Sequence, residues 1–577
     1  MSSDSLNSDL TNFTTIDYVS FVLVLGISVG IGLYFAIWFK GRENTPEDYF
    51  LGGRDMGVIP VAVSLSVTFI SGILIIGFTT VVYQFGTYPW LDCFTFLIMT
   101  LCVVFLFLPI FYEVKLPSTF GYIRLRFGRK AQLMASFISI VTATLYVSVN
   151  LYIPALVLNF TLGTSILTGT LVLGSCCIFY TTFGGFRAVI WADFFQACLI
   201  VLCNVAIVYI GLKLVGGFEE VWDASERGGR IIIFDFDPDP TIRFSTLNFL
   251  FGSTFVVTQQ FGLNQSSIQR YLSTSSIKKA RCVAVIFYVN ISVVMLLCVL
   301  TGLIIYAYYE NCDPVSSGIV REPDQIVPLF VMEMAHHLSG LSGIFVAGIV
   351  AGCLSTMSSC LNSSTVCLYE DFLRPYLPEM SNQKTCNLLK MVTVVLGCLQ
   401  IILVFVIMKI GSIITILLTL MGLTNGSMLG LFTMGMLVPK ANQTGAIAGT
   451  VTSIVCVAVV LYGGLYKKPD PTLPVNTEGC HHNFTSLLNH SNFEEPDDLP
   501  LIFRISFMYY GTMGFVIAYL VGVPVSLLTG GNTITDQRLL APFLRRKNQE
   551  VPGTNIPERI DLFSGYSNLD INASSRT

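Results

Sequence analysis

The stretch "STMSSCLNSS", residues 355–364, places side-chain oxygens inside a segment that is otherwise apolar. Ser355 and Thr356 are adjacent hydroxyls, and Ser358, Ser359 and Asn362 follow within two helical turns. Hard cations prefer oxygen ligands. If the hydroxyl pair faced unwound backbone carbonyls, it could hold a desolvated sodium ion without any carboxylate. One interpretation of this stretch is therefore a sodium site.

A second interpretation is a helix-packing surface. Gly348 and Gly352 form a GxxxG pair, and Ser355 and Ser359 continue the face of small residues. Small residues and hydroxyls commonly make close helix contacts and hydrogen bonds within membranes. Composition alone does not separate the two interpretations.

Two other apolar segments carry polar interruptions in their middle. "VAVSLSVTFISGILIIGFTT" contains Ser64, Ser66, Thr68, Ser71 and Gly72. "LNFLFGSTFVVTQQFGLNQ" contains Gly252, Ser253 and Thr254. Serine and glycine loosen the helical hydrogen-bond ladder, and unwound backbone at membrane depth is tolerated only where it lines a cavity or an ion site.

Asp193, in "AVIWADFFQ", is the clearest ionisable residue within an apolar segment. Such a residue either marks an ion path or is a helix-end carboxylate in a structural hydrogen bond. All five histidines fall in predicted outer loops, which disfavours a histidine-based proton pump. Cys480 and the two histidines after it are more typical of a loop than of a metal site.

The elements that position these residues must be membrane helices. Of the 577 residues, 53% are hydrophobic and only 12% are charged, about half the usual charged fraction of a soluble domain. The net charge of −4 gives no indication of a nucleic-acid partner. No CxxC pair, P-loop, kinase motif or hydrolase elbow occurs, so neither a cofactor nor an enzymatic reaction is expected.

Apolar runs of about 20 residues predict thirteen membrane spans. They begin near residues 16, 57, 90, 131, 165, 188, 244, 279, 340, 387, 411, 443 and 503. The first is followed by "KGR", which places the N-terminus outside and the C-terminus inside. Most Lys and Arg residues then fall in inner loops and the tail, including those of "RLRFGRK" and "SSIKKAR".

The predicted outer segments contain sequons at Asn12, Asn483 and Asn489, where glycosylation is expected. Cys312 and Cys480 are the only two cysteines in the predicted outer loops. The compartment permits a disulfide between them but does not establish it.

Six stretches in order resemble the sodium/solute symporter family. They are "EDYFLGGRDMGVIPVAVSLSVTFISG", "LPSTFGYIRLRFGRK", "TTFGGFRAVIWADFFQ", "GLNQSSIQRYLS", "AGCLSTMSSCLNSSTVCLYEDF" and "LGLFTMGMLVPKANQTGAIAG". The resemblance covers residues 16–530 and is greatest to the branch that carries monocarboxylates, iodide, or biotin and pantothenate. It implies an all-α polytopic membrane protein with the LeuT-type fold of two inverted five-helix repeats, each beginning with a discontinuous helix. One extra helix would precede the repeats and two would follow them.

This resemblance implies the following organisation. An extracellular N-terminus (1–15) precedes the first span and an inner loop (16–56), the first repeat of spans 2–6 (57–215), an outer loop (216–242), the second repeat of spans 7–11 (243–438), spans 12–13 with a glycosylated loop (439–530) and a cytoplasmic tail (531–577).

The resemblance also implies roles for individual residues. The implied sodium ligands are the carbonyls of Val67, Ile70 and Gly352 and the hydroxyls of Ser355 and Thr356. Asp193 would lie on the inward route of the released ion. Ser358, Ser359 and Asn362 would support these groups or hold a second ion, with helix packing as the open alternative.

The implied substrate cavity would be lined by Phe69, Ser71, Leu74, Thr254 and Asn264. Leu74 stands where sugar and iodide carriers of the family have a glutamine, which argues against sugar and less firmly against iodide. No buried arginine is expected in mid-span, which fits a monovalent anion better than a dianion, because half-helix ends and hydroxyls suffice for a single carboxylate.

The sequence therefore predicts a multi-pass plasma-membrane symporter that couples Na⁺ to uptake of a small monovalent organic anion, such as lactate, pyruvate or a short-chain fatty acid. Iodide and the vitamin carboxylates biotin and pantothenate are the alternatives within the family. A passive ion channel and a non-transporting sensor are the alternatives from other classes. The oligomeric state is not predicted.

Overall fold

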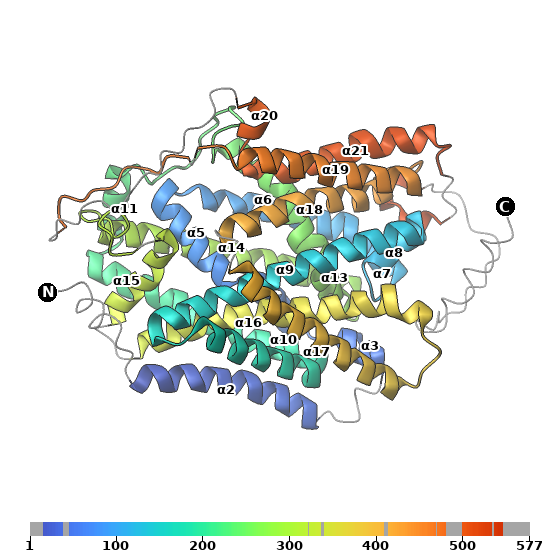
Figure 1. The fold of residues 1–577 in the computed structure, drawn as a ribbon, viewed down its shortest axis with the longest axis horizontal. Coiled ribbons are helices and arrows are strands. Elements are labelled where there is room, and N and C mark those ends of the chain that lie inside the picture. The colour runs from blue at the N-terminus through green and yellow to red at the C-terminus, as the bar shows by residue number, and fades with distance from the viewer. Residues whose placement is uncertain are drawn as a thin grey trace.

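The computed structural model describes residues 15–38, 45–320, 322–335, 340–408, 413–468, 470–480, 499–532 and 536–545. Helices and turns make up this part of the chain, with no strand among the described residues. Figure 1 shows the long helices running roughly along one axis of the molecule. The predicted glycosylation sites Asn12, Asn483 and Asn489 lie outside the described residues.

The helices differ widely in length. The long ones are α2 (Thr15–Trp38), α9 (Arg129–Leu162), α10 (Ile166–Val215), α14 (Ile277–Tyr308), α16 (Leu341–Cys367), α17 (Asn382–Ile407), α18 (Ile413–Leu437), α19 (Gln443–Gly464) and α21 (Tyr510–Leu528). The shorter ones are α3 (Pro46–Leu51), α4 (Val58–Phe69), α5 (Gly72–Phe85), α6 (Asp92–Cys102), α7 (Leu108–Val114), α8 (Phe120–Phe127), α11 (Phe218–Arg227), α12 (Thr254–Val257), α13 (Gln265–Leu272), α15 (Ile326–Ala335) and α20 (Leu501–Arg504).

Nine helices in the described part of the chain are long and apolar enough to cross a membrane. The number is ten if Pro46–Arg54 and Val58–Phe69, which meet at 111°, form one broken span. One of the nine is α10, whose 50 residues would extend about 75 Å as a straight helix, more than twice the thickness of the hydrocarbon core. Gly185 interrupts it with φ 57° and ψ −162°, a conformation that favours glycine. The two predicted spans that begin near 165 and 188 lie mainly on either side of this break.

Four segments are π-helical: η3 (Val103–Phe107), η4 (Asn248–Ser253), η5 (Thr258–Leu263) and η7 (Leu368–Leu373). Two of them, η4 and η5, flank α12 in the predicted seventh span. Such wider turns are rare and occur most often at functional sites. The seventh span is therefore irregular over most of its length.

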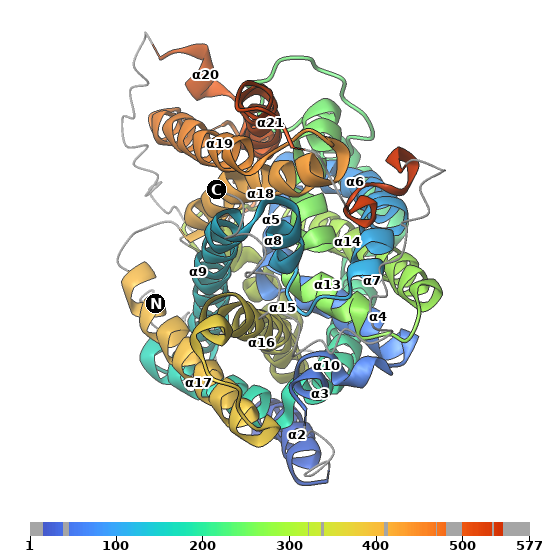
Figure 2. The same ribbon diagram turned by 90° about the vertical axis from the view of Figure 1, so that its right-hand side faces the viewer.

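The helix α16, which carries residues 355–364, is the central helix of the molecule. In its most apolar window, 94% of the residues are buried, against 28% for α2 and for the terminal α21 segment. It packs against α10, α9, α17, α2 and α4. The turned view of Figure 2 shows α16 enclosed by its neighbours. Its polar side chains therefore contact protein rather than lipid.

The loops at one end of the molecule are covalently linked. Cys312, just after α14, forms a disulfide with Cys480. The segment that precedes Cys480 also docks by backbone hydrogen bonds, from Leu473 N to Gln84 O at 2.8 Å and from Asp313 N to Asn476 O at 2.9 Å. This loop is thus attached to the end of α5 and to the segment after α14.

Candidate functional site

The site begins at a break between α4 and α5. The helix α4 ends at Phe69, and Ile70 leaves the helical conformation at φ −80° and ψ 73°. Ser71 then caps α5 by accepting a hydrogen bond from Leu74 N at 3.4 Å. Because α4 stops here, carbonyl oxygens of its last turn are left for other donors. The polar interruption at Ser71 and Gly72 predicted a break, and the structure has it there.

The hydroxyl pair on α16 meets those carbonyls. Ser355 Oγ lies 2.9 Å from Val67 O and 3.0 Å from Gly352 O. Thr356 Oγ1 lies 2.8 Å from Thr68 O and 3.0 Å from Gly352 O. Each hydroxyl has a single proton and can donate to only one of its two carbonyls at a time. Both side chains are fully buried.

Glycine permits this close approach. A Cβ atom on Gly352 would lie 2.9 Å from Ile70 O, which is closer than real Cβ atoms come to other atoms. The structure therefore brings the predicted ligands Val67, Ile70, Gly352, Ser355 and Thr356 to one oxygen-rich contact between the end of α4 and the middle of α16. This contact is common to both interpretations of the stretch, helix packing and an ion site.

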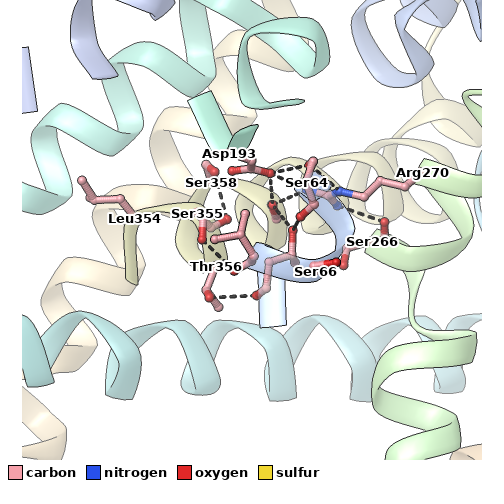
Figure 3. Close-up of polar contacts among 12 residues, drawn as sticks. Ser64, Ser66, Asp193, Ser266, Arg270, Leu354, Ser355, Thr356 and Ser358 are labelled. Atoms are coloured by element: carbon pink, nitrogen blue, oxygen red, sulfur yellow. Dashed lines mark hydrogen bonds and ion pairs between the residues drawn. The ribbon is translucent and has the colours of Figure 1, made fainter. Parts of the chain in front are cut away.

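A buried ion pair lies beside this contact, as Figure 3 shows. Asp193 Oδ2, on α10, accepts from Arg270 Nη2 at 3.0 Å and from Ser64 Oγ at 2.6 Å. Arg270 Nε donates to Ser64 Oγ at 3.0 Å, and its Nη1 donates to Ser266 O at 3.0 Å. The side chains of Arg270 and Asp193 are 1% and 0% exposed.

Arg270 is the residue that the sequence analysis missed. The expectation that no arginine is buried in mid-span is wrong, because Arg270 is buried at the level of Asp193. The physical reason is that the chain leaves the helix at Asn264 and begins the new helix α13, which packs against α4, α14 and α16 and carries Arg270 into the interior. A carboxylate inside an apolar helix needs a compensating charge nearby, and this need was the clue that could have indicated Arg270.

Ser359 connects the ion pair to the oxygen cluster. It accepts a short hydrogen bond from Arg270 Nη2, lies 3.4 Å from Asp193 Oδ2, and is 3.0 Å from Thr68 Oγ1. Ser358 instead donates to Ser355 O of its own helix at 3.0 Å. Asn362 is buried farther along α16.

The segment predicted as the seventh span breaks at a different residue from the expected one. Gly252 lies in η4 and Thr254 in α12, and the chain leaves the helix only at Asn264, with φ −61° and ψ 149°. Gly252 serves packing instead, because a Cβ atom there would lie 2.7 Å from Met508 O. Thr254 Oγ1 donates to Leu250 O of its own helix at 2.5 Å.

A small cavity of about 40 Å³, lined by both polar and apolar side chains, lies next to this second break. Its polar lining includes Tyr146, Gln259, Gln260, Asn264 and Asn425. Asn425 Nδ2 donates to Gln260 Oε1 at 3.3 Å, whereas Gln259 Oε1 is buried with no hydrogen-bond partner among the described residues. The cavity therefore offers amide groups that a small polar molecule could bind.

Of the five residues predicted to line a substrate cavity, Asn264 lines this one, and Phe69, Ser71, Leu74 and Thr254 are not part of its lining. Phe69 packs edge-on against Phe261 of η5, with ring centroids 4.6 Å apart. This ring contact packs the end of α4, next to the break at Ile70, against the π-helical segment η5.

A model of the sodium:solute symporter family matches residues 49–453. The sodium-coupled monocarboxylate transporter 2 of Danio rerio is 34% identical over 550 residues, 93% of this chain and 87% of the relative. The sodium-dependent multivitamin transporter of Oryctolagus cuniculus is 34% identical over 534 residues, 90% of this chain and 83% of the relative. The solved structure of a Na⁺-coupled sialic acid symporter superposes with a TM-score of 0.74 at 23% identity, over 91% of this chain and all of that one.

Proposed function

Because this chain belongs to the sodium:solute symporter family, we propose that its sodium-coupled transport carries a small monocarboxylate, such as lactate, pyruvate or a short-chain fatty acid, into the cell across the plasma membrane. The observation that carries this proposal is the oxygen-rich contact between α4 and α16, next to a cavity lined by amides. The Danio rerio relative named for monocarboxylates supports the choice of substrate.

The coupling ion is proposed to bind at the contact between α4 and α16. Carbonyls of Val67, Ile70 and Gly352 and hydroxyls of Ser355 and Thr356 supply five oxygens, and hard cations prefer oxygen. A sodium ion would use lone pairs of both hydroxyls, leaving their protons for other acceptors. Asp193 is proposed to lie on the route by which the ion leaves.

The proposed architecture has thirteen spans, with the N-terminus outside and the C-terminus inside. Residues 57–215 and 243–438 would form two inverted five-helix repeats. The breaks at Ile70 and Asn264 would then be the discontinuities in the first helix of each repeat, where transporters of this kind place substrate and ion. Alternating access would move these broken helices relative to α16.

The cavity beside the second break is the proposed substrate site, and Asn264 is the predicted lining residue that it contains. The amides of Gln259, Gln260 and Asn425 can donate hydrogen bonds to a carboxylate without a permanent charge. A single negative charge is compatible with such a site, because neutral donors and half-helix ends suffice to hold it.

A vitamin carboxylate is the second candidate substrate. The Oryctolagus cuniculus multivitamin transporter is 34% identical to this chain, the same identity as the Danio rerio monocarboxylate transporter. Overall identity therefore favours neither, and the amide groups would suit either carboxylate. The cavity, at about 40 Å³, would have to widen to admit either substrate, so its volume does not choose between them.

Uptake of radiolabelled lactate into cells that express the full chain tests the proposal. We expect uptake with sodium in the medium and none with choline, and we expect pyruvate and butyrate to compete where biotin and iodide do not. Sodium-dependent uptake of radiolabelled biotin, with no lactate uptake, would establish the second candidate. Uptake that proceeds equally in choline would contradict sodium coupling and favour a passive channel.

A further inference from the structure

Arg270 and Asp193 meet where four elements cross. The carboxylate comes from α10 and the guanidinium from α13, while Ser64 of α4 and Ser359 of α16 contact both of them. All four side chains are at most 2% exposed. Two of these elements, α4 and α13, adjoin the breaks at Ile70 and Asn264. The pair therefore connects segments that alternating access would have to separate.

The hydrogen bonds to Asp193 are unevenly divided between its two oxygens. Ser64 Oγ, Arg270 Nη2 and Ser359 Oγ all lie near Oδ2, at 2.6 Å, 3.0 Å and 3.4 Å. Oδ1 is buried and has no hydrogen-bond partner in the described part of the chain. A buried carboxylate oxygen without a donor is costly, and it is also a free ligand for a cation.

A surface ion pair shows the arrangement that uses both oxygens. Arg538 Nε lies 3.0 Å from Asp536 Oδ1, and Arg538 Nη2 lies 2.8 Å from Asp536 Oδ2. Such two-point contacts are the strong form of an arginine–carboxylate pair. Arg270 instead contacts only one oxygen of Asp193 and divides its other N–H groups between Ser64, Ser266 and Ser359.

The pair is also connected to the proposed sodium site. Thr68 accepts at its carbonyl from Thr356 at 2.8 Å, and its hydroxyl lies 3.0 Å from Ser359 Oγ. Ser359 in turn contacts Arg270 and lies near Asp193. A continuous row of oxygens thus runs from the ion site to the carboxylate.

We infer that Arg270 is a positioning residue for ion release, which competes with sodium for Asp193. The inference rests on the proposed function. An ion that leaves the oxygen cluster binds the free side of the carboxylate, and the adjacent guanidinium repels it. When the ion departs, Arg270 neutralises the carboxylate again. The guanidinium keeps its contacts to Ser266 O and Ser359 in either case, so it remains near the carboxylate.

This arrangement predicts the direction in which sodium affinity changes when the positive charge of Arg270 is removed. Two like charges a few ångströms apart in a buried site repel each other strongly. Without the guanidinium, Asp193 holds sodium more tightly and releases it more slowly. A purely structural arginine would have the opposite result, because its loss would loosen the site and weaken binding.

Equilibrium binding of radiolabelled sodium to the purified full-length protein tests the inference, since it needs no transported anion. We expect Arg270→Gln to lower the sodium Kd about tenfold and to slow sodium-coupled turnover. The double variant Asp193→Asn/Arg270→Gln should not show this tighter sodium binding, because it lacks the carboxylate. Ser66→Ala, on the same helix as Ser64, is the matched control and should bind sodium as the wild type does.

Arg270→Lys provides a second variant if Arg270→Gln fails to fold. Lysine keeps the charge but lacks the planar fork, so we expect the Kd to fall by about threefold. An unchanged or raised Kd in the folded Arg270 variants would overturn the inference. Failure of lactate uptake in the wild type, with sodium binding that responds as described, would overturn only the proposed substrate. Absence of sodium binding in the wild type would overturn both the sodium site and this inference.

Discussion

Among the described residues, Arg270 and Arg230 are the two arginines that are at most 1% exposed, and their surroundings differ in kind. Arg270 is 1% exposed and contacts a carboxylate and hydroxyls on three other helices. Arg230, in the loop after α11, is 0% exposed; its guanidinium donates hydrogen bonds to backbone carbonyls and lies over an aromatic ring, and the Asp313 carboxylate is close enough to interact with it electrostatically. Its guanidinium lies 3.9 Å from the ring centroid of Tyr306.

The partners of Arg230 are backbone atoms of loops that are anchored elsewhere. Its Nη1 donates to Gly228 O at 2.5 Å and to Pro474 O at 2.6 Å, and its Nε donates to Tyr83 O at 3.3 Å. The segment that supplies Pro474 is the one held by the disulfide of Cys480.

The comparison shows how the environment determines what a buried arginine can do. Backbone carbonyls cannot change their charge or bind a competing proton, and they move only with their loop. Arg230 is therefore suited to holding these loops together. A carboxylate can exchange one cation for another, so Arg270 is suited to a step in which a cation comes and goes.

The largest expected effect is a loss of stability when the charged partner of Arg270 is removed. Asp193→Ala leaves Arg270 buried without a counter-charge, and breaking such a pair from one side costs about 3–5 kcal/mol in the free energy of unfolding. Asp536→Ala, which breaks the exposed pair with Arg538, should cost less than about 1 kcal/mol. Thermal unfolding of the two purified variants measures the difference, and equal melting temperatures would contradict it.

An intermediate effect is expected at Arg230. Arg230→Gln leaves buried carbonyls of Gly228 and Pro474 without donors, at a cost of about 2 kcal/mol in stability. Because none of the hydrogen-bond partners of Arg230 is a proposed sodium ligand, the sodium Kd of the folded fraction should stay within about twofold of the wild type. Parallel unfolding and sodium-binding measurements check both parts. A lower sodium Kd in Arg230→Gln, like that expected for Arg270→Gln, would contradict the inference that only Arg270 competes with sodium.

The smallest effect is expected at Ser64, which contacts both members of the pair. Ser64→Ala removes one donor to Asp193 and one acceptor from Arg270 but keeps both charges. The stability should fall by about 1 kcal/mol. The rate of sodium-coupled uptake should change less than in Arg270→Gln, and an equal change in both variants would show that the hydroxyl matters as much as the guanidinium.

The sequence was informative where the chemistry is local. Ser71 and Gly72 indicated the break between α4 and α5, because an N-capping hydroxyl next to glycine is a local feature of helix ends. The pattern of the hydroxyl pair likewise placed Ser355 and Thr356 on one buried helix. The family resemblance was confirmed by the family model over residues 49–453.

The sequence was less informative where tertiary packing determines the position and role of a residue. Gly252 resembles a helix interruption, but its lack of a side chain serves the contact with Met508. Arg270 follows a polar segment and so resembles a loop residue, although α13 carries it into the protein interior beside Asp193. No local pattern contains the position of the segments that pack against these two residues, and both errors arise from that.

The sodium dependence of uptake in Thr356→Ala tests whether the hydroxyls of α16 bind the coupling ion. Thr365→Ala is the matched control, since Thr365 is buried on the same helix but its hydroxyl contacts only Leu361 O and Thr393. We predict that Thr356→Ala, at wild-type surface levels, needs at least about tenfold more sodium for half-maximal uptake, and that Thr365→Ala is unchanged. The same sodium dependence in both variants and the wild type would contradict the ion site and leave helix packing as the role of this stretch.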